Sequence, residues 1–323
     1  MPERISEKDS MALYFVKTMA ILASVAAHVS VMDLSTPVNA FFTRMWDMVS
    51  CISVGGFLII GGIFYTRTPG DSRSFWRRKA GSMILPWLFC GMLTYGYRAI
   101  YEPSSLLGLV YWLIGKGSWL YYVTIHLLML VLFKPIHRNV PALWGCVAVT
   151  VVQLLLKTGG GGVPSPFDSD YLNPLHWIGF FALGILLRRQ GLRFEKKFLL
   201  GCAVVLAVSS VVVYRRWIYN YFHILNMVFS VSAFFVLFAL GRLLADTGLR
   251  KAIRAIGVST YCIYLLHMQI VQPILRRIPG DTFKAVFAPV IGVAVMMVLI
   301  DLGKWITAKL PFGQKLRALV GLR

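Results

Sequence analysis

The chain has 323 residues, of which 58% are hydrophobic and only 14% are charged, and its mean hydropathy is +0.70. These values exclude an ordinary water-soluble domain and are typical of a protein that crosses a membrane several times. The net charge of +20 does not indicate a nucleic-acid partner, because the basic residues stand in short clusters between apolar segments. We therefore expect an all-α polytopic membrane protein with a single domain over residues 1–323.

Ten apolar segments are candidates for transmembrane helices, each of which needs about 20 apolar residues. They cover residues 11–31, 47–66, 80–99, 118–136, 141–157, 174–190, 197–214, 224–243, 256–275 and 282–303. The segment from Ser104 to Gly115 is too short to span and predicts an interfacial or re-entrant piece. If the N-terminus is cytoplasmic, most Lys and Arg residues fall on the inner side, so both termini are expected to be cytoplasmic. The first segment is too long for a signal peptide and should remain as an anchor.

Lys17 and His28 lie eleven residues apart inside the first apolar segment. This spacing is about three helical turns, so both side chains share one face, roughly 16 Å apart along the axis. A charge within a membrane helix is costly and by default indicates a functional site that faces a hydrated cavity. This interpretation predicts one tunnel reached by both side chains. Alternatively, Lys17 extends to the interface and His28 makes a structural hydrogen bond.

Further candidate functional residues lie in the ninth predicted helix and in an outer loop. His267 is in the outer half of the ninth segment and is a second candidate base, or a structural histidine. Asp168 and Asp170 belong to an outer loop that begins at Gly159 and could border an outward site. The glycine-rich stretch that ends at Gly62 predicts close packing of two membrane helices.

A basic run, Arg77, Arg78 and Lys79, stands at the inner mouth of the third segment. It could hold the phosphates of a cosubstrate such as coenzyme A, bind anionic lipid headgroups, or serve only to orient the chain. The sequence has no zinc-binding motif, phosphate-binding loop or dinucleotide fingerprint. We therefore expect no metal and no permanently bound cofactor.

Six motifs follow one another along almost the whole chain. They are the Lys17–His28 pair, VGGFLIIGGIF (Val54 to Phe64), FWRRKAGSMILPWLF (Phe75 to Phe89), SWLYYVTIHLLMLVLFKP with Trp119, FFALGILLRR (Phe180 to Arg189) and GVSTYCIYLLH (Gly257 to His267). In type and order they resemble the membrane-bound acyltransferase-3 family, bacterial multi-pass enzymes that acylate exported or envelope glycans. The chain departs from the family pattern at Lys17, Gly61, Ser82 and Gly117, where the family has arginine, serine, arginine and histidine.

The resemblance implies transfer of an acyl group, with acetyl expected, from acetyl-CoA or another acyl-CoA in the cytoplasm. The acceptor would be a sugar hydroxyl of a glycan or lipid-linked sugar on the outer side of the bacterial inner membrane. The expected catalytic residues are His28 and Lys17. Donor binding is expected at Arg77, Arg78, Lys79 and Trp119, and acceptor binding at His267, Tyr264, Asp168 and Asp170. Membrane lipids and polysaccharide-synthesis machinery are the expected partners.

Two other functions also fit a chain of this kind. A secondary transporter or glycan flippase would explain the number of helices and the buried charge, with Asp301 as the main candidate for ion coupling. However, no internal repeat indicates such a transporter. A non-catalytic subunit of a polysaccharide-export complex would tolerate alanine at both Lys17 and His28.

Overall fold

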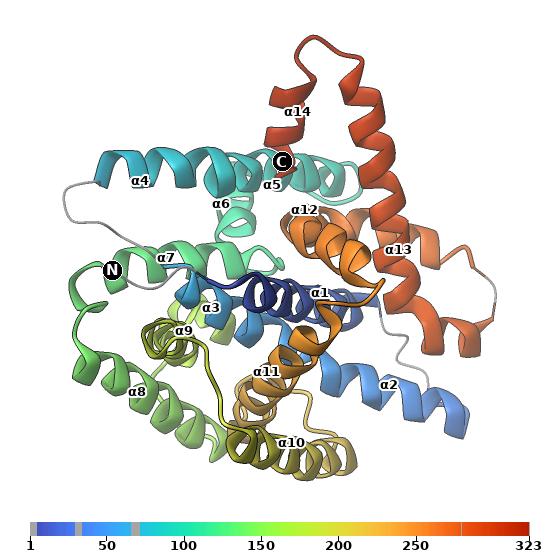
Figure 1. The fold of residues 1–323 in the computed structure, drawn as a ribbon. Coiled ribbons are helices and arrows are strands. Elements are labelled where there is room, and N and C mark those ends of the chain that lie inside the picture. Colours follow the sequence, from blue (N-terminus) through green and yellow to red (C-terminus); the bar gives the residue numbers. More distant parts are fainter. Residues whose placement is uncertain (1–4, 30–33, 66–71, 279, 323) are drawn as a thin grey trace.

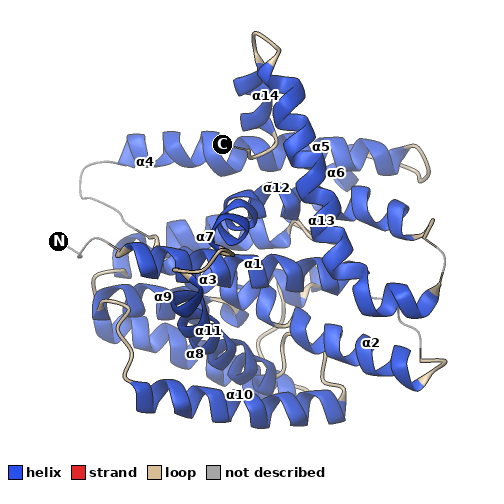
Figure 2. Ribbon diagram, turned by 45° about the vertical axis from the view of Figure 1, so that its right-hand side comes forward, coloured by secondary structure: helices blue, strands red, loops and turns tan. Residues whose placement is uncertain are grey.

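The computed structural model describes residues 5–29, 34–65, 72–278 and 280–322. All regular secondary structure in these ranges is helical, which confirms the all-α prediction. Figures 1 and 2 both place α1 in the middle of the molecule, with the other helices around it. The α-helices are α1 (Glu7–Val29), α2 (Pro37–Ser50), α3 (Ile52–Ile63), α4 (Ser72–Lys79), α5 (Leu85–Ala99), α6 (Leu106–Ile114), α7 (Tyr121–Ile136), α8 (Val140–Thr158), α9 (Ile178–Gln190), α10 (Lys196–Arg216), α11 (Ile224–Leu244), α12 (Arg250–Leu275), α13 (Asp281–Ala308) and α14 (Gly313–Leu319).

In the described residues, seven helical segments are long and apolar enough to cross a membrane, counting α2 and α3 as one. They are α1, α2–α3, α8, α10, α11, α12 and α13. The other three predicted spans form the shorter helices α5, α7 and α9, with 15, 16 and 13 residues. A multi-pass membrane protein is therefore supported, whereas the count of ten and the cytoplasmic termini remain predictions. The segment predicted to lie at the interface forms α6, whose Leu106 and Leu107 are exposed.

Helix α1 can occupy the centre because small residues line it. Ala12, Ala20 and Ala23 are completely buried. Gly241 of α11 packs directly against the backbone of Ala12, and Gly257 of α12 packs against Tyr14. Small side chains let helix backbones approach closely, which is the main source of packing energy between helices in a membrane. The same arrangement surrounds the central part of α1 with protein.

Helix α10 lies at the periphery of the molecule (Figure 1), and large apolar side chains on it are exposed. It packs against α11, while Leu200, Val204, Val208 and Val211 on its other face are exposed. Exposed aliphatic side chains on a long helix suit contact with lipid acyl chains. The outer face of α10 is therefore apolar.

Helices α3 and α9 pack backbone to backbone through Gly62 and Gly184. A Cβ atom added at Gly62 would overlap the carbonyl group of Phe181, and one at Gly184 would overlap the carbonyl group of Ile59. Most residues of both helices are buried, so moving either helix away would disturb its other contacts. The packing role predicted for the glycine-rich stretch is therefore confirmed.

Replacing Gly184 by Ala should separate α3 from α9 and destabilise the protein by about 3 kcal/mol or more, as expected for overpacking against backbone. Gly201→Ala in α10 is the matched control, because a Cβ there meets no atom within 4 Å. Thermal unfolding of the two detergent-solubilised variants provides the measurement. Equal melting temperatures would contradict the proposed tight contact.

Candidate functional site

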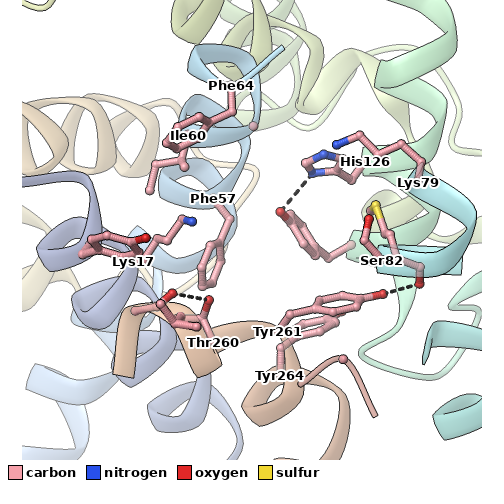
Figure 3. Close-up of a pocket in the computed structure, with 17 residues that line it drawn as sticks. Lys17, Phe57, Ile60, Phe64, Lys79, Ser82, His126, Thr260, Tyr261 and Tyr264 are labelled. Carbon is pink, nitrogen blue, oxygen red and sulfur yellow. Dashed lines mark hydrogen bonds between the residues drawn. The ribbon is translucent and has the colours of Figure 1, made fainter. Parts of the chain in front are cut away.

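One cavity, here called the Lys17 cavity, has a volume of about 520 Å³ and is bordered by α1, α3, α7, α12 and the junction of α4 with α5. Figure 3 shows its walls. The lining residues are mostly aromatic, small or hydroxylated: Tyr14, Lys17, Phe57, Ile60, Gly61, Phe64, Lys79, Ser82, Met83, Tyr122, His126, Gly257, Val258, Thr260, Tyr261, Tyr264 and Gly321. No Asp or Glu is among these described residues. The described lining of the cavity therefore contains two lysine side chains and no carboxylate.

The two ammonium groups approach the cavity from opposite walls (Figure 3). Lys17 Nζ lies 5.5 Å from the ring centre of Tyr14 and 5.3 Å from that of Phe64. Cation–π contacts of this kind partly compensate for lost hydration, although they do not neutralise the charge. Lys79 stands on the far side, near His126. A cavity with this charge is suited to an anionic or strongly polarised ligand.

A π-helical turn, Ala80–Ile84, shapes the wall beside Lys79. In a regular α-helix the carbonyl group of Ser82 would accept from residue 86, but Pro86 has no N–H group. The turn widens there instead, and it places Ser82 and Met83 at the cavity. Tyr261 of α12 donates a hydrogen bond of 2.7 Å to the carbonyl group of Met83, which fixes the turn against α12.

His126 of α7 is a residue of this cavity that the sequence prediction did not include among the site residues. Its Nδ1 lies 3.0 Å from the hydroxyl of Tyr122, one helical turn earlier. Gly61 makes room for the ring, because a Cβ at Gly61 would lie only 2.7 Å from Cε1 of His126. The absence of a side chain at position 61, noted above as a departure from the family pattern, therefore lets an imidazole take that space. The four-residue spacing of Tyr122 and His126 puts both side chains on one face of a helix, so the sequence could have predicted this pair.

A second cavity, here called the His28 cavity, has a volume of about 370 Å³. It is lined by Ser24, Ala27, His28, Ser53, Val54, Phe57, Trp112, Gly115, Gly117, Ser118, Trp119, Tyr121, Tyr122, Ser169, Tyr171, Tyr221, Tyr264 and Met268. Hydroxyl groups are abundant in this wall, and no Asp or Glu lines it in the described part of the chain. Hydroxyls and aromatic faces are the groups that commonly contact polar ligands with many hydroxyls, because they both donate and accept hydrogen bonds.

His28 is adjacent to His267 of α12, with 5.2 Å between the ring centres. Nδ1 of His267 lies 2.9 Å from the carbonyl oxygen of Tyr264 and 3.1 Å from that of Ile263. Two carbonyl acceptors require a proton on this nitrogen, so Nε2 of the neutral ring is an acceptor. This Nε2 is buried and has no hydrogen-bond partner among the described residues, and the same holds for the indole nitrogen of Trp119.

The side chains of Lys17 and His28 therefore line two adjoining cavities, and a single tunnel that both side chains reach stays a prediction. Among the residues that the structure describes, only Phe57, Tyr122 and Tyr264 line both cavities. The ring centres of Phe57 and Tyr122 are 5.7 Å apart, and those of Tyr122 and Tyr264 are 5.4 Å apart. These three side chains, here called the aromatic partition, stand where the two cavities adjoin.

The structure places the other predicted site residues as follows. Lys79 lines the Lys17 cavity, whereas Arg77 and Arg78 are exposed beside it on α4. Trp119 lines the His28 cavity and not the cavity of the lysines, where donor binding was expected. Tyr264 lines both cavities, and His267 is completely buried behind His28.

The two loop carboxylates predicted to bind the acceptor do not line either cavity. Asp168 is exposed, and Asp170 accepts from Ser165 at 2.5 Å and pairs with Lys157 at 2.9 Å. Burial alone would raise the pKa of Asp170, but these two partners outweigh it and hold the pKa below its usual value. The neighbouring Ser169 and Tyr171 do reach the His28 cavity, so the loop borders it through other side chains.

Comparison with known proteins gives one clear result. A family model for the acyltransferase-3 domain, described as an acyltransferase domain, matches residues 12–308. No curated protein and no solved structure was found to match the chain. The match begins in α1 and ends in α13, so it includes nearly every residue that lines the two cavities. The chain therefore belongs to the acyltransferase-3 family.

Proposed function

We propose that the protein transfers an acyl group, with acetyl expected, from a cytoplasmic acyl-CoA to a sugar hydroxyl of an envelope or exported polysaccharide. The reaction would take place in the bacterial inner membrane, with the acceptor on its outer side. Membership of the family supports acyl transfer. The observation that carries the proposal further is that α1 contributes Lys17 to one cavity and His28 to a second, adjoining cavity.

The Lys17 cavity is the proposed site of the donor thioester. Its two ammonium groups, with no carboxylate among the described lining residues, favour a ligand whose carbonyl oxygen or phosphates carry negative charge. Arg77 and Arg78 stand exposed next to Lys79, where they would hold the phosphates of coenzyme A outside the cavity. Lys17 would then orient the thioester end, which lies deeper along α1.

The His28 cavity is the proposed site of the acceptor sugar. His28 lines this cavity, and no described residue makes a hydrogen bond to its ring nitrogens, so the imidazole is available to a ligand. In the reaction, the acceptor oxygen attacks the thioester carbonyl carbon while His28 takes the hydroxyl proton. The C–S bond then breaks, the thiolate of coenzyme A leaves, and the proton is returned to it. The two products are an O-acylated sugar and coenzyme A with a free thiol.

The tetrahedral intermediate of this reaction carries negative charge on the former carbonyl oxygen. The buried indole N–H of Trp119 has no partner among the described residues, and it lies in the same wall as His28. A fixed donor of this kind in a poorly solvated site stabilises a developing oxyanion more than water does. Trp119 is therefore proposed to act at the acyl carbonyl, instead of at the nucleotide end of the donor.

The placement of carboxylates favours an enzyme over an ion-coupled transporter. Asp301, the main candidate for coupling, is exposed on α13 and lies 3.7 Å from Lys304. Neither cavity has a lining Asp or Glu in the described residues. Coupling to protons or sodium ions commonly uses a carboxylate inside the membrane, next to the substrate.

Replacing His28 by Asn should remove the proton acceptor with little change in volume. We expect acyl transfer to the glycan to fall by roughly 10²- to 10⁴-fold, the usual contribution of a general base. Mass spectrometry of the glycan from cells that express each variant gives the measurement. His137→Asn is the matched control, because His137 lines neither cavity. Normal acylation in the His28 variant, at equal protein level, would refute the assignment.

Replacing Lys17 by Met should keep the length of the side chain while removing its charge. Loss of a charged partner worth about 1.5–3 kcal/mol should raise the KM for acetyl-CoA roughly ten- to hundredfold. Lys17→Arg should recover most of this loss because it restores the cation. Lys8→Met, at the exposed start of the same helix, controls for a general effect of lost charge. An unchanged KM in Lys17→Met would argue against contact with the donor.

A further inference from the structure

Two members of the aromatic partition make hydrogen bonds, whereas the third has no group that can make one. The hydroxyl of Tyr122 is bonded to Nδ1 of His126 at 3.0 Å, and the hydroxyl of Tyr264 donates to the carbonyl group of Trp119. Phe57 has no polar atom and is held by packing alone, on a helix whose next turn carries Gly61. Phe57 is also only partly buried, whereas the two tyrosines are buried. Displacing Phe57 therefore breaks no hydrogen bond, so it costs less than displacing either tyrosine.

The proposed reaction requires the partition to open. The thioester carbon and the acceptor oxygen must come within about 3–3.5 Å of each other before a bond forms. One approaches from the Lys17 cavity and the other from the His28 cavity, and Phe57 lines both. The space released by a displaced ring therefore limits the size of the acyl group that can meet the acceptor.

From this arrangement we propose that Phe57 is the specificity-determining residue for the acyl group, and that its ring closes the passage between the two cavities. This inference rests on the proposed function for its chemistry, whereas the closure itself concerns only the shape of the protein. A short acyl group such as acetyl passes beside the ring. A chain with several more carbon atoms requires the space that the ring occupies.

The first experiment measures donor preference. Membranes with the unmodified protein or Phe57→Ala receive an equimolar mixture of acetyl-CoA and hexanoyl-CoA, and the ratio of the two acyl groups on the acceptor is determined. Removing the six ring carbons should shift this ratio toward hexanoyl by on the order of tenfold or more, because even one methylene of pocket space changes discrimination about tenfold or more. Phe57→Leu should give a smaller shift, and it keeps the test valid if the Ala variant does not fold.

Phe64→Ala is the matched control for donor preference. Phe64 lies seven residues further along the chain from Phe57, beside the same cavity, but it lines only the Lys17 cavity. Because Phe64 contacts Lys17, this variant should change transfer of both donors together and leave their ratio as it is in the unmodified protein. An equal change of ratio in the Phe57 and Phe64 variants would overturn the specific role of Phe57.

The second experiment tests the closure without using acyl transfer. One cysteine is added, at Ser118 in the His28 cavity or at Ser82 in the Lys17 cavity. The partly exposed Cys146 and Cys202 are changed to Ala, and the three buried native cysteines are kept. A membrane-impermeant thiol reagent is applied to the side from which Ser118→Cys is modified. Ser82→Cys should resist the reagent from that side when Phe57 is present, and should become modified several times faster with Phe57→Ala.

The two readouts separate the possible failures. No gain in modification at position 82 would overturn the closure by Phe57. A gain in modification without a shift in donor ratio would overturn its role in specificity. Absence of acyl transfer by the unmodified protein would instead contradict the proposed function, while the modification rates would still decide whether Phe57 separates the cavities.

Discussion

A lysine ammonium in the middle of a membrane-spanning helix is the constraint on which the rest of the structure depends. In hydrocarbon such a charge is costly, so it has to face a cavity that water or a ligand can enter. Lys17 meets this requirement at the centre of the molecule, between two aromatic rings and opposite Lys79. No lining carboxylate neutralises it in the described residues, so the charge remains available to a ligand.

Close helix packing is what makes this cavity possible. Glycine and alanine at the contacts of α1, α3 and α9 bring the backbones together, and the larger side chains gather around the open space. Gly61 shows the same relation within the site, since the space beside it is filled by the imidazole of His126. The two cavities and the wall between them therefore follow from where the small residues stand in the sequence.

Hydropathy and residue spacing predicted much of the fold, because long apolar segments and their periodicity are local properties. Every predicted span contains a helix, and the short segment before Gly115 forms α6. The spacing of Lys17 and His28 also indicated a shared helix with a functional role. The division into two cavities was not predictable in this way, since Phe57, Tyr122 and Tyr264 come from three separate helices. Likewise, only tertiary contacts reveal that Asp170 pairs with Lys157 and that Trp119 stands beside His28 instead of the lysines.

The central claim is that the two cavities divide the donor and the acceptor between them along one helix. An experimentally determined structure of the full chain in lipid, with a non-hydrolysable acetyl-CoA analogue, tests this claim most directly. We expect the acyl end of the analogue inside the Lys17 cavity, against the ring of Phe57, with its phosphates outside near Arg77 and Arg78. An analogue bound elsewhere, or a Lys17 side chain that faces lipid in that structure, would contradict the account.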